Sequence, residues 1–181
     1  MKTAITGLMM IMLACGGGGG KSIAEADALF AAGDYSTALA LYITFIPKNG
    51  GEAQVGAGWC DLRLNSYAQA DSFFAAAAAD SLPDGYAGWC FTSWALNSAQ
   101  EAIDYAAFVL IKEPSYAFSL DSRVDKDHLI WIQAESYLEL QNYQACIDKI
   151  ILLDGGFTAN ASDPDIANIL AAKLQTLGAA S

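Results

Sequence analysis

The fold of this chain is decided between residues 28 and 42, by the stretch Ala28-Leu29-Phe30-x-x-Gly33-Asp34-Tyr35-x-x-Ala38-Leu39-x-x-Tyr42. Gly33 and Asp34 form a turn-favouring pair that can also cap the helix after it. The small Ala38 lets two helices approach closely, and the large Tyr35 fills the gap between neighbouring units. The stretch therefore predicts a helical hairpin, in which Phe30 and Tyr42 are core residues.

The pattern returns in three further copies, which together cover most of the remaining chain. They contain Gly58-Trp59, Leu62, Asn65-Ser66-Tyr67, Ala70 and Phe74, then Trp94, Leu96-Asn97-Ser98, Ala99, Ala102 and Pro114, and last Ala134, Tyr137-Leu138, Gln141-Asn142-Tyr143 and Cys146. One hairpin cannot bury its apolar face alone, whereas stacked hairpins can. The copies resemble the tetratricopeptide repeat (TPR) family, which implies an all-α, right-handed superhelical array of about four hairpins.

Two segments depart from the repeat. The loop Ser115 to Asp125 adds residues between the third and fourth copies, with Tyr116, Phe118 and Leu120 alternating with small residues. It can act as a lid or contact surface, or it can lengthen the fourth hairpin or cover a gap. Farther on, Ser162-Asp163-Pro164-Asp165 predicts a helix start, and an apolar stripe follows at Ile166, Ile169, Leu170, Leu174 and Leu177. We interpret this as a helix that caps the array; the alternative is a partner-binding helix.

The N-terminus has the order of a secretory signal. Lys2 precedes an apolar stretch too short to span a membrane, and Leu13-Ala14-Cys15 follows it. The end of this segment resembles the lipobox of bacterial lipoproteins, although Met12 stands where that family usually has Leu. The resemblance implies a signal peptide at residues 1–14 and acylation of Cys15, with palmitate among the acyl groups.

The resemblance and the composition together divide the chain into three parts. Residues 15–21 form the lipidated cysteine and a Gly-rich tether, and residues 22–181 form the TPR-like domain. No acidic residue follows Cys15 directly, which by resemblance to proteobacterial lipoproteins favours the outer membrane, facing the periplasm. We therefore expect an exported protein that is held at the cell envelope by a lipid anchor.

Composition and charge exclude some function classes. The chain is 54% hydrophobic and 16% charged, which excludes a solvated, disordered chain. Its net charge of -11 repels phosphate backbones, so nucleic acid is excluded as a partner. A packed protein with a protein or peptide partner remains.

The TPR resemblance places a partner-binding groove on the concave wall formed by the first helix of each hairpin. Carried over position by position, it assigns this groove to Phe30, Val55, Trp59, Leu62, Arg63, Phe91, Trp94, Trp131, Glu135 and Leu138. Such a wall suits an apolar or aromatic anchor, because it lacks the several Lys or Arg residues needed to grip a carboxylate. The alternative is that Trp59 and Trp94 are covered by the loop near Tyr116 or by the last helix.

The sequence suggests no enzyme, cofactor or metal site. His128 is the only histidine, and Cys60, Cys90 and Cys146 lack zinc-ligand spacing. We expect buried free thiols, although export would permit a Cys60–Cys90 disulfide. A second hypothesis is a small P-loop phosphotransferase, suggested by Gly20-Lys21-Ser22 together with the stretch 149–154; however, Cys15 replaces the first glycine, and no Val/Ile-rich strand runs follow. A third is a purely structural spacer.

Overall fold

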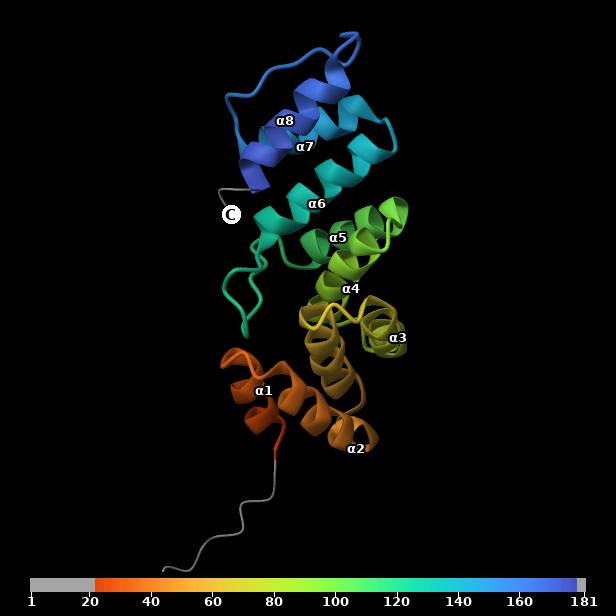
Figure 1. The fold of residues 1–181 in the computed structure, drawn as a ribbon, viewed down its shortest axis with the longest axis vertical. Coiled ribbons are helices and arrows are strands. Elements are labelled where there is room, and N and C mark those ends of the chain that lie inside the picture. The colour runs from red at the N-terminus through yellow and green to blue at the C-terminus, as the bar shows by residue number, and fades with distance from the viewer. Residues whose placement is uncertain (1–21, 179–181) are drawn as a thin grey trace, which may run out of the picture.

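The computed structural model describes residues 22–178, and within that range the chain forms an elongated stack of helices (Figure 1). The helices are α1 (Ile23–Ala31), α2 (Tyr35–Arg63), α3 (Tyr67–Ala77), α4 (Pro83–Ala95), α5 (Ala99–Lys112), α6 (Lys126–Glu139), α7 (Tyr143–Leu153) and α8 (Ile166–Gly178). A short 3₁₀ helix, Ala78–Asp80, follows α3. The described residues contain one isolated β-bridge, Ala117 to Asp125, and no strand. The predicted all-α fold is confirmed.

The hairpin turns lie where the sequence predicts them. The residue two positions before each second helix is left-handed, with φ of 82° at Gly33, 60° at Asn65, 58° at Asn97 and 57° at Gln141. Glycine and asparagine tolerate this conformation better than most residues do. At the first turn, the carboxylate of Asp34 accepts a hydrogen bond from the backbone N–H of Thr37 and so caps the next helix.

Helix α2 belongs to two hairpins. Its backbone leaves helical geometry at Asn49 and Gly50, where Gly50 has a φ of 26°. Residues 35–48 therefore complete the first hairpin, and residues 51–63 begin the second. Each helix packs on its neighbours in sequence, and α2, α4, α6 and α8 also pack on one another in that order. The second half of α2 together with α4 and α6, which are the first helices of three hairpins, therefore forms one wall of the stack, and α8 continues this wall.

Glycines allow the close approach of helices around Phe74. A Cβ at Gly58 of α2 would lie 2.7 Å from Cε1 of this ring, and one at Gly88 of α4 would lie closer still. Phe74 itself comes from α3 and is fully buried. The small residues expected between helices are buried as well: Ala38, Ala70, Ala102 and Cys146. Phe74 is thus clamped between two helices that only glycine brings near enough.

The last helix caps the array, as predicted. Helix α8 packs on α6 and α7 and buries Ile166, Leu170 and Leu174. Two expectations were wrong in detail. The helix begins at Ile166 and not at Pro164, because residues 160–165 form turns in which Asp163 accepts a hydrogen bond from the backbone N–H of Asp165. Ile169 is exposed and lies outside the buried stripe.

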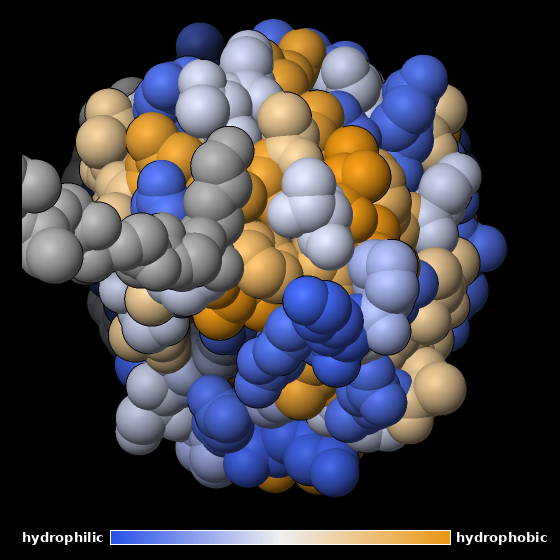
Figure 2. All heavy atoms as spheres, turned by 90° about the horizontal axis from the view of Figure 1, so that it is seen from below, coloured by the Kyte–Doolittle hydropathy of each residue, from blue (hydrophilic) through white to orange (hydrophobic). Residues whose placement is uncertain are grey.

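The opposite end of the array is formed by α1 and α2. Figure 2 looks at this end along the long axis and shows apolar residues across its middle and polar residues along its lower rim. Ile43 of α2 is among the exposed apolar side chains of the protein. The N-terminal end therefore lacks a dedicated capping helix of the α8 kind within the described residues.

Candidate partner-binding clefts

The loop between α5 and α6 fills the middle of the concave wall. Tyr116 and Phe118 point inward and are buried, although the residues beside them, Ser115 and Ala117, are exposed. The Phe118 ring stacks on Trp59 with 4.4 Å between centroids, and it meets Phe30 edge to face at 5.9 Å. Of the two roles open to this loop, the structure shows that it covers a gap.

Polar contacts fasten the loop at two points. The hydroxyl of Tyr116 donates a hydrogen bond to the carboxylate of Asp84 at 2.9 Å. The guanidinium of Arg63 pairs with Asp121 at 2.5 Å, and Arg123 also donates to Asp121. These hydrogen bonds from Arg123 and the nearby charge of Arg63 hold the pKa of Asp121 below its usual range, against the effect of burial. The loop is thus tied to both α2 and α4.

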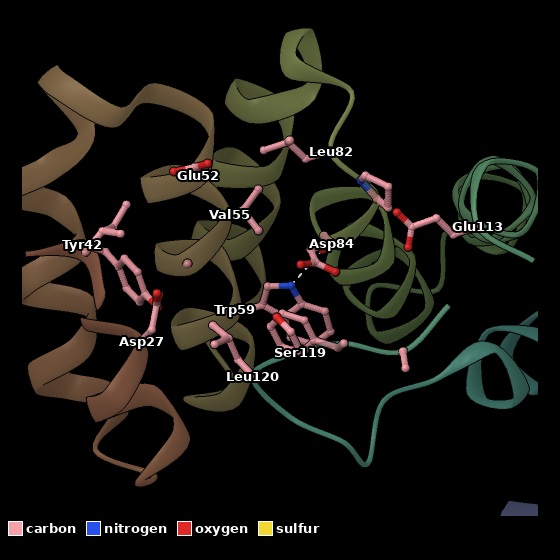
Figure 3. A pocket seen from close by; sticks show the side chains of 15 residues that line it. Asp27, Tyr42, Glu52, Val55, Trp59, Leu82, Asp84, Glu113, Ser119 and Leu120 are labelled. Carbon is pink, nitrogen blue, oxygen red and sulfur yellow. Dashed lines mark hydrogen bonds between the residues drawn. The ribbon is translucent and has the colours of Figure 1, made fainter. Parts of the chain in front are cut away.

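On one side of this loop lies a hollow of about 500 Å³, which we name the N-terminal cleft. Its lining comes from α1, α2, the start of α4 and the loop: Ile23, Asp27, Tyr42, Glu52, Val55, Gly56, Trp59, Leu82, Pro83, Asp84, Glu113, Ala117, Phe118, Ser119 and Leu120. The indole N–H of Trp59 donates to the backbone carbonyl of Asp84 at 2.8 Å and so joins α2 to α4 beneath the cleft (Figure 3). Its floor is apolar and aromatic.

Four carboxylates surround this floor. Asp27 accepts a hydrogen bond from the hydroxyl of Tyr42 at 2.6 Å, and Asp84 accepts one from Tyr116. Burial raises the pKa of Asp84, with a further increase from nearby Glu113 and a partial offset from the Tyr116 hydrogen bond. Glu52 and Glu113 are exposed at the rim. Among residues 22–178, the lining holds these carboxylates and no Lys, Arg or His, so this part of the chain makes the cleft acidic.

On the other side of the array, two adjoining hollows of about 490 and 470 Å³ share Glu135 and form the C-terminal cleft. Trp94 and Trp131 meet edge to face here at 5.5 Å, and the indole N–H of Trp131 donates to the carbonyl of Leu174 in α8. Burial raises the pKa of Glu135. The lining comprises Phe91, Trp94, Ala95, Asn97, His128, Trp131, Glu135, Leu138, Glu139, Ala171, Gln175 and Gly178.

The residues predicted for one groove are divided between these places. Phe91, Trp94, Trp131, Glu135 and Leu138 line the C-terminal cleft, whereas Val55 and Trp59 border the N-terminal cleft.

Phe30, Val55 and Trp59 are buried, and Phe118 packs on Phe30 and Trp59, so of the two alternatives for Trp59 the structure shows the one in which the loop covers it. Leu62 and Arg63 are half-buried, and Arg63 is engaged by Asp121.

Sequence reasoning missed the acidic lining of the N-terminal cleft. Glu52, Asp84 and Glu113 were not among the predicted groove residues, because they come from three separate segments and have no common spacing. The loop was recognised by its length and by the alternation of large and small residues from Tyr116 to Leu120, and cover of Trp59 by this loop was one of the alternatives. The contact of Phe118 with Trp59 itself was not specified.

The remaining predictions have separate outcomes. Cys60, Cys90 and Cys146 are buried and free, so the Cys60–Cys90 disulfide is not present. His128 lies near the start of α6 and contacts Asp125 at 2.9 Å. The stretch 149–154 falls largely in α7 and is not the strand that a P-loop enzyme needs. Cys15, the tether and Gly20-Lys21 of the P-loop hypothesis lie outside the described residues.

The described residues show neither a metal-binding cluster nor a membrane-spanning helix. Residues 22–178 contain no group of three or more His, Cys, Asp or Glu side chains that could hold a metal ion. In the same range, no helix has the length and apolar character needed to cross a membrane.

Comparison with solved structures supports the fold. The chain is similar to the crystal structure of a tetratricopeptide repeat protein from Parabacteroides merdae, with a TM-score of 0.58 and 15% sequence identity. The match covers 87% of this chain and 59% of that one, so this chain spans less than two thirds of the length of its structural neighbour. No family model and no curated protein matches the sequence. The described chain therefore has a TPR-like fold, as the repeat pattern predicts.

Proposed function

We propose that this chain is an exported, lipid-anchored TPR-like protein that binds a segment of a protein partner on its concave wall and so acts as an interaction or assembly module at the bacterial cell envelope. The fold supports the first part, because stacked helical hairpins offer extended concave surfaces to partner chains. The predicted signal peptide and Cys15 support the second. The outer membrane, with the domain in the periplasm, is the proposed location.

The observation that carries the binding proposal is the exposure of Trp94 within the C-terminal cleft. Its side chain is 38% exposed although it packs against Trp131, and Leu138 lines the same hollow. Tryptophan at the centre of a concave, partly desolvated site is the residue type that most often anchors a partner. The fold does not need this exposed surface for its own core, so binding accounts for it better than a structural spacer does.

The binding proposal is tested by changing the cleft without changing the core. We expect the double substitution Trp94→Ser and Leu138→Ser to abolish recovery of a partner with the protein from membrane extracts, while the helical circular dichroism spectrum stays intact. The matched control is Ile111→Ser with Leu152→Ser, because both residues are highly exposed and neither lines a cleft described above. Equal recovery with both double variants contradicts the proposal.

The anchor is tested separately by intact mass spectrometry of the protein extracted from membranes. A chain that begins at an acylated Cys15 is the expected result, and Cys15→Ser provides the control. An uncleaved chain that retains Met1 contradicts export and lipidation. It would leave the binding proposal standing, because the clefts belong to residues 22–178.

A further inference from the structure

We propose that the N-terminal cleft binds a basic segment of the protein partner, whose lysine or arginine side chain enters between carboxylates on two facing walls. This inference rests on the proposed function and adds to it the chemistry of the partner. It concerns a different cleft from the one around Trp94, so the two can fail independently.

The carboxylates approach the cleft from both sides. Figure 3 shows Asp27 and Glu52, from α1 and α2, on one side of the cleft and Glu113, just after α5, on the opposite side, with Asp84, from the start of α4, between them beside Trp59. A cation held between these sides is attracted by both, whereas a carboxylate or phosphate is repelled by both. The geometry therefore selects the sign of the charge that enters.

Residues 22–178 supply no cation to this cleft. None of the fifteen lining residues is basic, and Arg63, one helical turn from Trp59, is already paired with Asp121. Asp27 and Asp84 each accept one hydrogen bond from a tyrosine hydroxyl, and a hydroxyl carries no positive charge. The net charge of -11 adds a field of the same sign around the cleft.

The floor of the cleft suits the stem of such a side chain. Leu82 and Leu120, both half-buried, line it above the buried side chains of Val55, Trp59 and Phe118. Lysine and arginine lay their methylene stems along apolar surface while the charged head reaches polar groups. A volume of about 500 Å³ accommodates a few side chains of an extended segment and excludes a folded domain.

The C-terminal cleft differs from the N-terminal cleft in its arrangement of charges. It has carboxylates at Glu135 and Glu139, but it also contains His128 and an exposed indole, and its carboxylates lie on one helix, α6. It therefore lacks the facing arrangement of negative charge. An extended partner segment with a basic residue and an apolar or aromatic anchor would complement both clefts.

The test compares two fluorescein-labelled nine-residue peptides, one alternating lysine with leucine and one alternating glutamate with leucine, binding to the full chain purified in detergent. We expect the lysine peptide to bind at least about tenfold more tightly, with affinity that falls as salt is added. The double variant Glu52→Gln and Glu113→Gln should weaken its binding about fivefold or more, because it removes two rim carboxylates and preserves their shape.

The matched control is Glu101→Gln with Asp148→Asn, which changes the net charge equally at two exposed sites on α5 and α7, outside the cleft. It should alter affinity less than about twofold, since distant exposed charges are screened. Equal weakening by both double variants, or equal binding of the two peptides, overturns the inference. The Trp94 and Leu138 experiment would still report on the proposed function, so the two failures are distinguishable.

Discussion

The ring of Phe118 lies almost parallel to the indole of Trp59, with an angle of 17° and a centroid distance of 4.4 Å. Phe118 belongs to a loop and Trp59 to the first helix of the second hairpin, so this contact fixes the loop against the concave wall. The same stretch of loop, Ala117 to Leu120, lines the N-terminal cleft, so the shape of that cleft depends on this stacking.

Removal of the Phe118 ring should destabilise the protein. We expect Phe118→Ala to lower the free energy of unfolding by about 3 kcal/mol, because it leaves a cavity against Trp59 and Phe30. Urea unfolding followed by circular dichroism measures this change. Ser119→Ala, at the exposed neighbour, should alter stability by less than about 0.5 kcal/mol. Similar values for both substitutions would show that the loop is not part of the core.

A methyl group at Gly58 should destabilise the fold. In Gly58→Ala the new Cβ would lie 2.7 Å from the buried Phe74 ring, so we expect a loss of about 1 to 2 kcal/mol after the gain in helix propensity. Gly155→Ala serves as the control, because a Cβ there meets nothing within 4 Å. Thermal unfolding of the two variants measures the difference. A Gly58→Ala protein as stable as the control would contradict the close packing of α2 on Phe74.

The ion pair of Asp121 should make stability depend on pH in acid. A carboxyl whose folded pKa is lowered stabilises the fold above its unfolded pKa of about 3.9, and this contribution is lost as pH falls through the folded pKa. We expect Asp121→Asn to cost about 1 to 2 kcal/mol at neutral pH, partly because Arg63 loses its partner. The difference from the wild type should shrink below about pH 4.

Urea titrations at several pH values test this prediction. Asp80→Asn, at an exposed carboxyl, should follow the wild-type pH profile. A difference between Asp121→Asn and the wild type that stays constant down to the lowest pH would show that folding does not lower the pKa of Asp121.

The three cysteines should be inert in the folded protein. Burial raises the pKa of Cys60 and Cys146 to about 12, and it also raises that of Cys90. In a Cys15→Ser background, we expect them to react with a thiol-specific disulfide reagent at least about a hundredfold more slowly than in guanidinium. An added Ile111→Cys should react at once, because residue 111 is exposed. Rapid reaction of the native cysteines would contradict their burial.

Sequence reasoning recovered the fold because the information was local. Each hairpin repeats the same small and large positions, so Tyr35 and Tyr67 could be aligned without any structure. The break in α2 at Asn49 and Gly50 agrees with this alignment, which assigns Tyr42 to the first hairpin and Val55 to the second. This boundary contains the turn-forming residues Pro47, Asn49, Gly50 and Gly51.

The clefts were harder to foresee. Their lining combines residues such as Glu52 and Glu113, which are far apart in the sequence and border the same cleft only in the folded array. Phe118 shows the same limit. The sequence indicates the extra loop that contains it, but the direction of its side chain depends on the space above Trp59 in the folded protein. Trp94, Trp131 and Leu138 were identified because the TPR resemblance assigns positions on one helix face at a time.

Photo-crosslinking in intact cells tests the central claim most directly. A benzophenone amino acid replaces Trp94, which is exposed in the C-terminal cleft, and in a second strain it replaces Leu152, which is more exposed but lines none of the clefts. We expect a discrete covalent adduct with one partner protein from position 94 and none from position 152. The same adduct from both positions, or none from position 94 in a correctly folded protein, would contradict a concave partner-binding site.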